Sequence, residues 1–229
     1  MKKDKHPLPL FDDFLLSIQA NNYSERTLYN YERDLLSFEY FLNSEINLPF
    51  SKLTKRNIEQ FKAYLNSRDR KTSDGHQSEQ KLSSGSINRI LSSLRRYLSY
   101  LSDMDQDIPV APTAIKLLRK ERRHPQVSEL DELISLIEAP MKYEKDKMVA
   151  LRNRAALEVL FASGMRISEL ISIRRNQIDH TGRIFIEGKG RKQRFVYLTE
   201  RALYHIKQYL EKRDDDAPFL FVARRGLNA

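Results

Sequence analysis

Apolar side chains recur three or four positions apart through most of the first hundred residues, and this spacing restricts that part of the chain to helices. Polar residues fill the intervening positions, as they do on the outer face of an amphipathic helix. Ser24 stands before one of these patterns, at a place that suits the N-cap of a helix, and the next pattern opens near Thr54. The core-facing residues of the four expected helices are Phe11, Phe14, Leu15 and Ile18; Leu28, Tyr31, Leu35, Phe38, Phe41 and Leu42; Ile58, Phe61, Tyr64 and Leu65; and Ile87, Ile90, Leu91, Leu94, Leu98 and Leu101.

A polar stretch separates the third expected helix from the fourth. Residues 66–86 include two glycines and almost no apolar side chain, so we expect a loop there. The polar side of the fourth helix carries Asn88, Arg89, Arg95 and Arg96. These four side chains are candidates for contacts with a polyanion, and an ordinary solvated helix face is the alternative that the pattern leaves open.

The composition changes after the fourth helix. Residues Asp103–Val127 begin with acidic side chains, contain two prolines and continue into a basic stretch with few apolar residues. We interpret this segment as an interdomain linker that lies along an anionic partner, although an exposed connector has the same composition. The sequence therefore predicts a helical domain over residues 1–110, a basic linker over 111–127 and a second domain over 128–229.

The second domain is expected to combine helices with one β-hairpin. Ser128 and Asp131 have a spacing close to that of a capping box. Two runs of β-branched and aromatic residues, 184–186 and 195–198, flank a turn that contains glycine, and they predict antiparallel strands. Pro218–Val222 is expected to be buried. The expected helices are Leu130–Ile137, Val149–Ala162, a short helix from Arg166, and Glu200–Lys212.

The junction between two of these helices has the features of an anion site. Gly164 stops the longer helix as a C-cap glycine does, and Arg166 opens the next helix. An arginine at that place adds its guanidinium to the unpaired N–H groups of the helix start, which suits it to bind a phosphate. Glu169, three residues later, lies on the same helix face and is expected to orient the guanidinium. Lys189, on a Gly-flanked turn, supplies a second cation.

For an isolated Arg-x-x-Glu pair, a surface ion pair of little energetic value is the better interpretation. What favours a functional site is the combination, in order, of the helix stop, Arg166, Glu169 and a hairpin with Gly-Lys-Gly at its turn.

The charge of the chain agrees with a polyanionic partner. Forty Lys and Arg face 31 Asp and Glu, which gives +9 and a pI near 9.6. Residues 111–229 hold +8 of this charge, and Arg183–Arg194 holds five basic residues against one acidic residue. Excess base favours nucleic-acid binding only weakly, because a solvated charged turn explains the same run.

Several classes of protein are excluded or disfavoured. The absence of cysteine excludes disulfides and thiol chemistry. The five histidines are scattered without ligand spacing, so we expect no metal site and no cofactor. No apolar run approaches the roughly 18–20 residues that span a membrane. No apolar signal core follows the basic start, so we expect a cytoplasmic location and no membrane partner.

Three stretches resemble the tyrosine recombinase (phage integrase) family, and its Xer branch in particular. Ser163–Leu170, Ser-Gly-Met-Arg-Ile-Ser-Glu-Leu, looks like the first conserved box of the family. Glu187–Arg194, Glu-Gly-Lys-Gly-Arg-Lys-Gln-Arg, looks like its catalytic-lysine hairpin, and Ile87–Tyr97 resembles a helix of its core-binding domain. The resemblance implies a mainly α fold, with a helical, SAM-like core-binding domain before a partial, mainly α catalytic domain that has a small antiparallel β-sheet.

The resemblance also implies a reaction, site-specific DNA recombination. In this family two arginines and a histidine bind the non-bridging oxygens of one DNA phosphodiester, and a lysine protonates the departing 5′ oxygen. A tyrosine attacks phosphorus and forms a 3′-phosphotyrosine, without a metal or a nucleotide. Carried over, Arg166 is the first clamp arginine, Glu169 the acid that orients it, and Lys189 the general acid. The implied partners are double-stranded DNA and further subunits, in a homo- or hetero-tetramer on paired sites. The expected DNA contacts are Asn88, Arg89, Arg95, Arg96, Arg191, Lys192 and Arg194.

The sequence departs from the family pattern after Lys189. The family shows a His-x-x-Arg box and then a tyrosine, whereas His205 is followed by Ile-Lys-Gln. We therefore interpret the chain as C-terminally truncated, unable to cleave DNA by itself, and open on an apolar face near Phe161, Phe219 or Phe221. The alternative is a non-catalytic DNA-binding regulator or decoy on an integrase scaffold. The tyrosines downstream of the lysine, which fit strand or helix packing, are Tyr197, Tyr204 and Tyr209.

Overall fold

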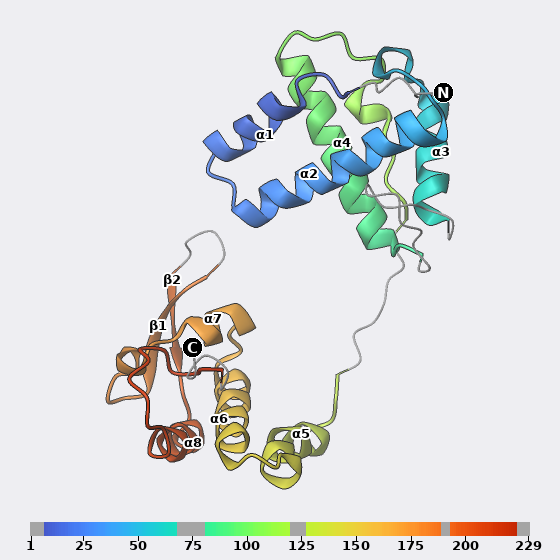
Figure 1. Cartoon of the computed structure of the whole chain (residues 1–229). Helices are drawn as coiled ribbons and strands as arrows, with labels where there is room; N and C mark the ends of the chain where they lie inside the picture. The colour runs from blue at the N-terminus through green and yellow to red at the C-terminus, as the bar shows by residue number, and fades with distance from the viewer. Residues whose placement is uncertain (1–6, 68–80, 120–126, 189–192, 224–229) are drawn as a thin grey trace. The chain divides into compact units, whose positions relative to one another are not determined.

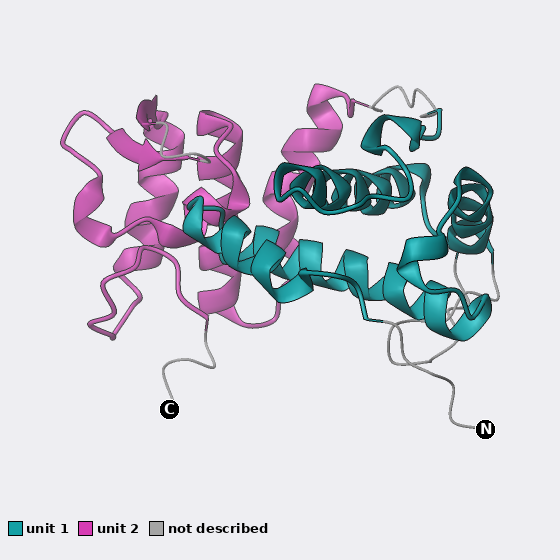
Figure 2. Cartoon of the chain, turned by 90° about the horizontal axis from the view of Figure 1, so that it is seen from above, with its two compact units in different colours: residues 1–124 teal, residues 125–229 magenta. Residues whose placement is uncertain are grey.

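The computed structural model of the chain describes residues 7–67, 81–119, 127–188 and 193–223. It divides into two compact units, Met1–His124 and Pro125–Ala229, each of which is described by itself (Figure 2). The expected fold class is confirmed, since both units are predominantly helical and the second contains a small antiparallel sheet.

The first unit is built from helices (Figure 1), and polar N-cap side chains fix the starts of several of them. Ser24 Oγ accepts a hydrogen bond from the Thr27 amide at 3.2 Å, so the expected N-cap is confirmed. The helix expected to open near Thr54 does so, and Thr54 Oγ1 accepts from the Asn57 amide at 3.4 Å. Gly85, expected in the loop, instead lies in the first turn of the last helix. The helices are α1 (Phe11–Ala20), α2 (Glu25–Tyr40, continued by a π-helical turn Phe41–Glu45), α3 (Lys55–Asn66) and α4 (Ser84–Asp103), with 3₁₀ turns at Phe50–Lys52 and Pro112–Ala114.

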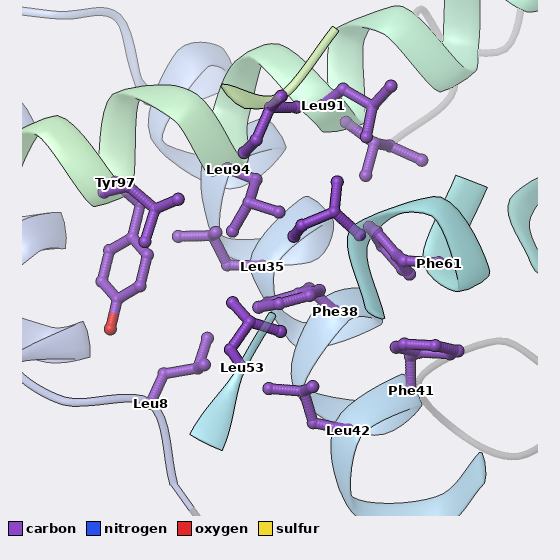
Figure 3. Packing of buried hydrophobic residues seen from close by; sticks show 14 of the residues in the cluster. Leu8, Leu35, Phe38, Phe41, Leu42, Leu53, Phe61, Leu91, Leu94 and Tyr97 are labelled. Atoms are coloured by element: carbon purple, nitrogen blue, oxygen red, sulfur yellow. The ribbon is translucent and has the colours of Figure 1, made fainter. Parts of the chain in front are cut away.

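The core of this unit forms where α2, α3 and α4 meet (Figure 3). The Phe38 and Phe61 rings pack edge to face with centroids 4.9 Å apart, and Leu91 and Leu94 of α4 are fully buried with them. Tyr97 is buried as well, and its hydroxyl donates to the Pro9 carbonyl. Burial raises the pKa of this phenol, so Tyr97 stays neutral and ties the start of the chain to α4.

The segment after α4 does not behave as the expected linker. Val110 and Ile115 are buried in the first core, and Leu118 packs against it. Asn88 Nδ2 donates to the Leu118 carbonyl at 2.9 Å, and Asn88 Oδ1 accepts from the Leu118 amide at 2.7 Å. Arg95 Nε donates to the Ile115 carbonyl at 2.7 Å. The prediction of a linker from residue 103 or 111 is therefore wrong as far as residue 118, because three apolar anchors and two polar side chains of α4 hold this strap on the first unit.

The first helix of the second unit has its N-cap one residue later than expected. The N-cap is Glu129, whose amide donates to Glu132 Oε2 at 3.2 Å, so Ser128 and Asp131 do not form the predicted box. That helix also extends beyond Ile137, with Pro140 inside it. The elements are α5 (Leu130–Tyr143), α6 (Lys147–Ser163), α7 (Ile167–Ser172), a 3₁₀ turn Arg175–Gln177, β1 (Arg183–Glu187), β2 (Gln193–Tyr197) and α8 (Glu200–Leu210).

The β-hairpin presents one face to the second core and the other to solvent. β1 and β2 pair antiparallel, with Ile184 opposite Val196 and Ile186 opposite Arg194. Ile184, Ile186 and Val196 are buried, together with Val159 of α6 and Ile206 of α8. Phe185 and Phe195, one position out of phase, are exposed and contact each other across the strands. This alternation puts residue 194 on the inward face of β2.

Candidate functional site

Gly164 ends α6 as the sequence predicts. Its φ of 59° is left-handed, its amide donates to the Leu160 carbonyl at 2.9 Å, and a Cβ there would meet nothing within 4 Å. This turn buries Met165 and brings Arg166 to the N-cap of α7. The helix stop therefore fixes where the arginine stands.

Glu169 holds Arg166 through both main chain and side chain. The Arg166 amide donates to Glu169 Oε2 at 2.8 Å, and Arg166 Nη1 donates to Glu169 Oε1 at 2.9 Å. The carboxylate is buried, with 5% of its side chain exposed, whereas 59% of the arginine side chain is exposed. The pair thus directs a guanidinium toward solvent from a buried acid, as an anion-binding arginine requires.

Arg194 is the second partner of the same carboxylate. Its Nη1 donates to Glu169 Oε1 at 3.1 Å and its Nη2 to Glu169 Oε2 at 2.9 Å, a bidentate pair. These bonds, and then the hydrogen bond from the Arg166 amide, lower the pKa of Glu169 to about 2, so it is ionised throughout the neutral range.

The sequence grouped Arg194 with the DNA contacts and missed this arrangement. A signal was available in the sequence. Residues 194 and 196 are two apart on one strand and therefore lie on the same, inward face, where an arginine needs a buried anion as its partner.

The base of the hairpin lies against this cluster. A Cβ at Gly188 would be 2.9 Å from Glu169 Oε1, 3.1 Å from Arg194 Nη1 and 3.3 Å from Arg166 Nη1. A side chain at this position would therefore displace the ends of these three side chains from their present arrangement. Lys189, Arg191 and Lys192 lie outside the described residues, so their convergence with Arg166 stays a prediction.

The four candidates on α4 differ in what they contact. Asn88 and Arg95 hold the strap that follows α4, as described above. Arg89 Nη1 pairs with Asp34 of α2, and Ser93 Oγ donates to the same Asp34 oxygen at 2.8 Å. Burial raises the pKa of Asp34, although the Ser93 bond and the Arg89 charge oppose that rise. Arg96 is exposed. Whether these residues contact DNA stays a prediction, and for three of them the structure adds a role within the protein.

One further basic surface escaped the sequence argument. Tyr29 of α2 is half exposed, and Arg26 and Arg33 lie over its ring at 5.9 and 5.6 Å from the centroid. The signal was the spacing of these residues, three and four positions apart on one helix face.

Metal-binding clusters and membrane-spanning helices are both absent from the part of the chain that the structure describes. None of its His, Asp and Glu residues gather in groups of three or more that could hold a metal ion. None of the described helices is both long enough and apolar enough to cross a membrane.

Two family models match the chain, one on each unit. Residues 126–228 match the phage integrase family, and residues 11–104 match the phage integrase N-terminal SAM-like domain. The chain belongs to the phage integrase family.

Two relatives are tyrosine recombinase XerC from Staphylococcus aureus. The protein of strain USA300 / TCH1516 is 31% identical over 202 residues, which cover 87% of this chain and 62% of the relative. The protein of strain MRSA252 is 31% identical over 191 residues, which cover 83% of this chain and 59% of the relative.

Solved structures of integrases share the fold of this family member. XerH site-specific recombinase bound to palindromic difH substrate has a TM-score of 0.66 at 21% identity, over 91% of this chain and 60% of XerH. A lambda integrase dimer bound to a COC′ core site has a TM-score of 0.66 at 16% identity, over 93% of this chain and 56% of the lambda integrase chain. The chain spans about three fifths of the length of the curated relatives it matches. These relatives are named as recombinases and integrases.

Proposed function

We propose that this integrase acts in site-specific recombination of duplex DNA and that Arg166 binds the phosphate at which a strand is exchanged. The observation that carries the proposal is the exposed Arg166 guanidinium, anchored on the buried carboxylate of Glu169 beside the base of the hairpin. A positive group fixed in this way stabilises the negative charge that develops on a phosphodiester in the transition state.

Lys189, the next residue after Gly188, is proposed as the general acid that protonates the departing 5′ oxygen. After Lys189, where the family pattern places them, the sequence contains no His-x-x-Arg box and no tyrosine following such a box. The chain by itself is therefore expected to bind DNA and to leave the phosphodiester intact, since arginine and lysine do not replace a nucleophile.

The proposed partners are double-stranded DNA and further recombinase subunits in a tetramer on paired sites. Integrase structures with the same fold include a lambda integrase dimer on a core site and a tetramer on a Holliday junction, which supports both proposals. Arg89 and Arg96 on α4, and Arg191 and Lys192 of the hairpin, are proposed to contact the DNA backbone. We also propose a cytoplasmic location, because the curated relatives are bacterial and bacterial DNA lies in the cytoplasm.

The test compares two single arginine losses in the second unit. Arg166→Ala removes the proposed phosphate ligand, and Arg183→Ala removes an exposed arginine of β1 that pairs with Asp179. Fluorescence anisotropy with a labelled duplex at low salt measures the affinity of each variant. Arg166→Ala is expected to weaken binding about tenfold, as for the loss of one charge-assisted phosphate contact, and Arg183→Ala much less. Equal effects of the two substitutions, or a wild-type chain without duplex affinity at low salt, contradict the proposal.

A further inference from the structure

We propose that Arg194 is a positioning residue, which fixes Glu169 and through it directs Arg166, and that it does not itself bind DNA. The proposal rests on the function proposed above, because it takes Arg166 as the phosphate ligand. It replaces the expectation from the sequence that Arg194 contacts DNA directly.

The hydrogen bonds divide the two arginines into different roles. Arg194 uses two nitrogens of its guanidinium on the two oxygens of Glu169, at 3.1 and 2.9 Å. Arg166 commits a single guanidinium nitrogen to the same carboxylate, at 2.9 Å. Because a guanidinium carries five N–H donors in a fixed fork, Arg166 keeps a wide edge for an external anion. Arg194 has both terminal nitrogens of its guanidinium on the carboxylate.

Burial supports the same division. Arg194 is 39% exposed and lies on the inward face of β2, opposite Ile186, whereas Arg166 is 59% exposed. A phosphate therefore has readier access to Arg166 than to Arg194.

The charges explain why a second arginine is needed. Glu169 is buried and ionised, and a lone arginine beside it forms a neutral pair that attracts phosphate weakly. With Arg194 the cluster carries a net charge of +1, and Glu169 is satisfied by four hydrogen bonds. Without Arg194, the carboxylate competes with DNA for the Arg166 guanidinium. Arg194 thus makes the positive charge of Arg166 available to a phosphate.

Gly188 shows that the arrangement is built into the hairpin. A Cβ at Gly188 would lie 2.9–3.3 Å from atoms of all three side chains and would displace Glu169 Oε1. Arg194 on β2 and Gly188 after β1 therefore bring both arms of the hairpin onto the helix that carries Glu169.

A double-mutant cycle in duplex binding separates positioning from direct contact. The four proteins are the wild-type chain, Arg194→Met, Arg166→Ala and the double variant, with Arg183→Met as the matched loss of charge on the same hairpin. Arg194→Met alone is expected to weaken binding about threefold to tenfold. In the Arg166→Ala background the same substitution still removes one positive charge but has no arginine to position, so it is expected to weaken binding clearly less than in the wild-type background. Full additivity of the two losses overturns the proposal.

NMR of the arginine side chains gives a readout that a purely structural role does not move. In the wild-type chain the guanidinium signals of Arg194 should show hindered rotation and stay in place when duplex is added, while those of Arg166 shift. An equal shift of both sets overturns the proposal. This comparison needs no variant, so it stands even where Arg194→Met fails to fold, which circular dichroism reports.

The failure of this proposal is distinguishable from failure of the proposed function. If the wild-type chain has no affinity for duplex, the proposed function is wrong, and DNA-free spectra still test the positioning. Arg194→Met, or Arg194→Lys where the former is unfolded, should then move the Arg166 signals, and Arg183→Met should leave them in place. Unchanged Arg166 signals in the Arg194 variant overturn the inference.

Discussion

Replacing Gly164 with alanine tests how the end of α6 sets up the site. The residue has φ 59° and ψ 21°, and a Cβ there would meet nothing within 4 Å, so the cost is purely conformational. A left-handed alanine costs about 1–2 kcal/mol, and the stiffer unfolded chain returns about 0.4–1 kcal/mol. We therefore expect Gly164→Ala to destabilise the second unit by about 1 kcal/mol. Asparagine tolerates this conformation, so Gly164→Asn should cost less.

Gly182→Ala is the matched control, because it makes the same chemical change under a different constraint. Its φ is 75°, and a Cβ there would lie 3.0 Å from Leu203 Cδ1 and 3.2 Å from the Leu198 carbonyl oxygen. The strain is similar, and overpacking adds about 1–3 kcal/mol. The expected total is about 2–4 kcal/mol, and the difference between the two variants isolates the cost of the clash.

Native-state hydrogen exchange measures both variants, since amides of α6 and of the hairpin report the opening free energy of the second unit alone. Duplex affinity at low salt is read in parallel, and Gly164→Ala should retain it, because no atom of the Arg166–Glu169 pair is displaced. The reasoning is refuted if Gly164→Ala costs as much as Gly182→Ala, or if it abolishes binding while the unit remains folded.

The other predictions concern the site and its charges. Gly188→Ala should displace the Glu169 carboxylate and shift the side-chain NMR signals of Arg166 in a folded protein; unchanged signals contradict the close approach. The pKa of Glu169 is lowered from its ordinary 4.5 to about 2, so its contribution to stability is present above pH 4.5 and is lost as pH falls toward 2. The stability gap between wild type and Glu169→Gln should therefore close over that range, as acid melts can show. Duplex affinity should fall with salt at a log–log slope of about −0.9 per phosphate contacted, and Arg96→Glu should lower the affinity; a flat salt titration rules this out. On a nicked duplex that traps cleavage, a denaturing gel should show no covalent adduct of this chain, and an adduct would refute the absence of a nucleophile.

Local patterns in the sequence predicted the elements whose causes are local. The Ser24 cap and the Gly164 stop depend on contacts within one helical turn, and the structure has both. The prediction of a cap at Ser128 was wrong, because the neighbouring residues offer a capping box with the same spacing. Glu129 and Glu132, one position later, make the hydrogen bond that Ser128 and Asp131 were expected to make, and spacing alone does not separate two adjacent boxes.

The strap after α4 was missed because its anchors have no period. Val110, Ile115 and Leu118 fit neither a helix nor a strand repeat, so composition alone suggested a linker. What holds the strap is a pair of hydrogen bonds from Asn88, thirty positions away in the sequence, and one from Arg95. Such long-range pairs leave no mark in a short window of sequence.

Charged residues show the same limit more sharply. Arg89 and Arg96 look alike on the polar face of a helix, yet Arg89 pairs with a buried aspartate 55 positions away and Arg96 is exposed. A basic helix face therefore indicates a polyanion only after intramolecular partners have been assigned. Asp34 was the available clue, because a carboxylate within an apolar stripe of α2 needs a cation close by.

The candidate site joins a local half and a distant half, and the register of the hairpin connects them. Arg166 and Glu169 are three residues apart, so the sequence predicts their pairing. Arg194 reaches Glu169 only because Ile186 stands opposite it and the inward face of β2 holds residues 194 and 196. A slip of one residue would turn Arg194 to solvent and bring Phe195 inward. The apolar residues that fix this register, Ile184 and Val196, thereby also fix the charge beside Arg166, so packing of the hairpin and electrostatics of the site are set by the same alternation.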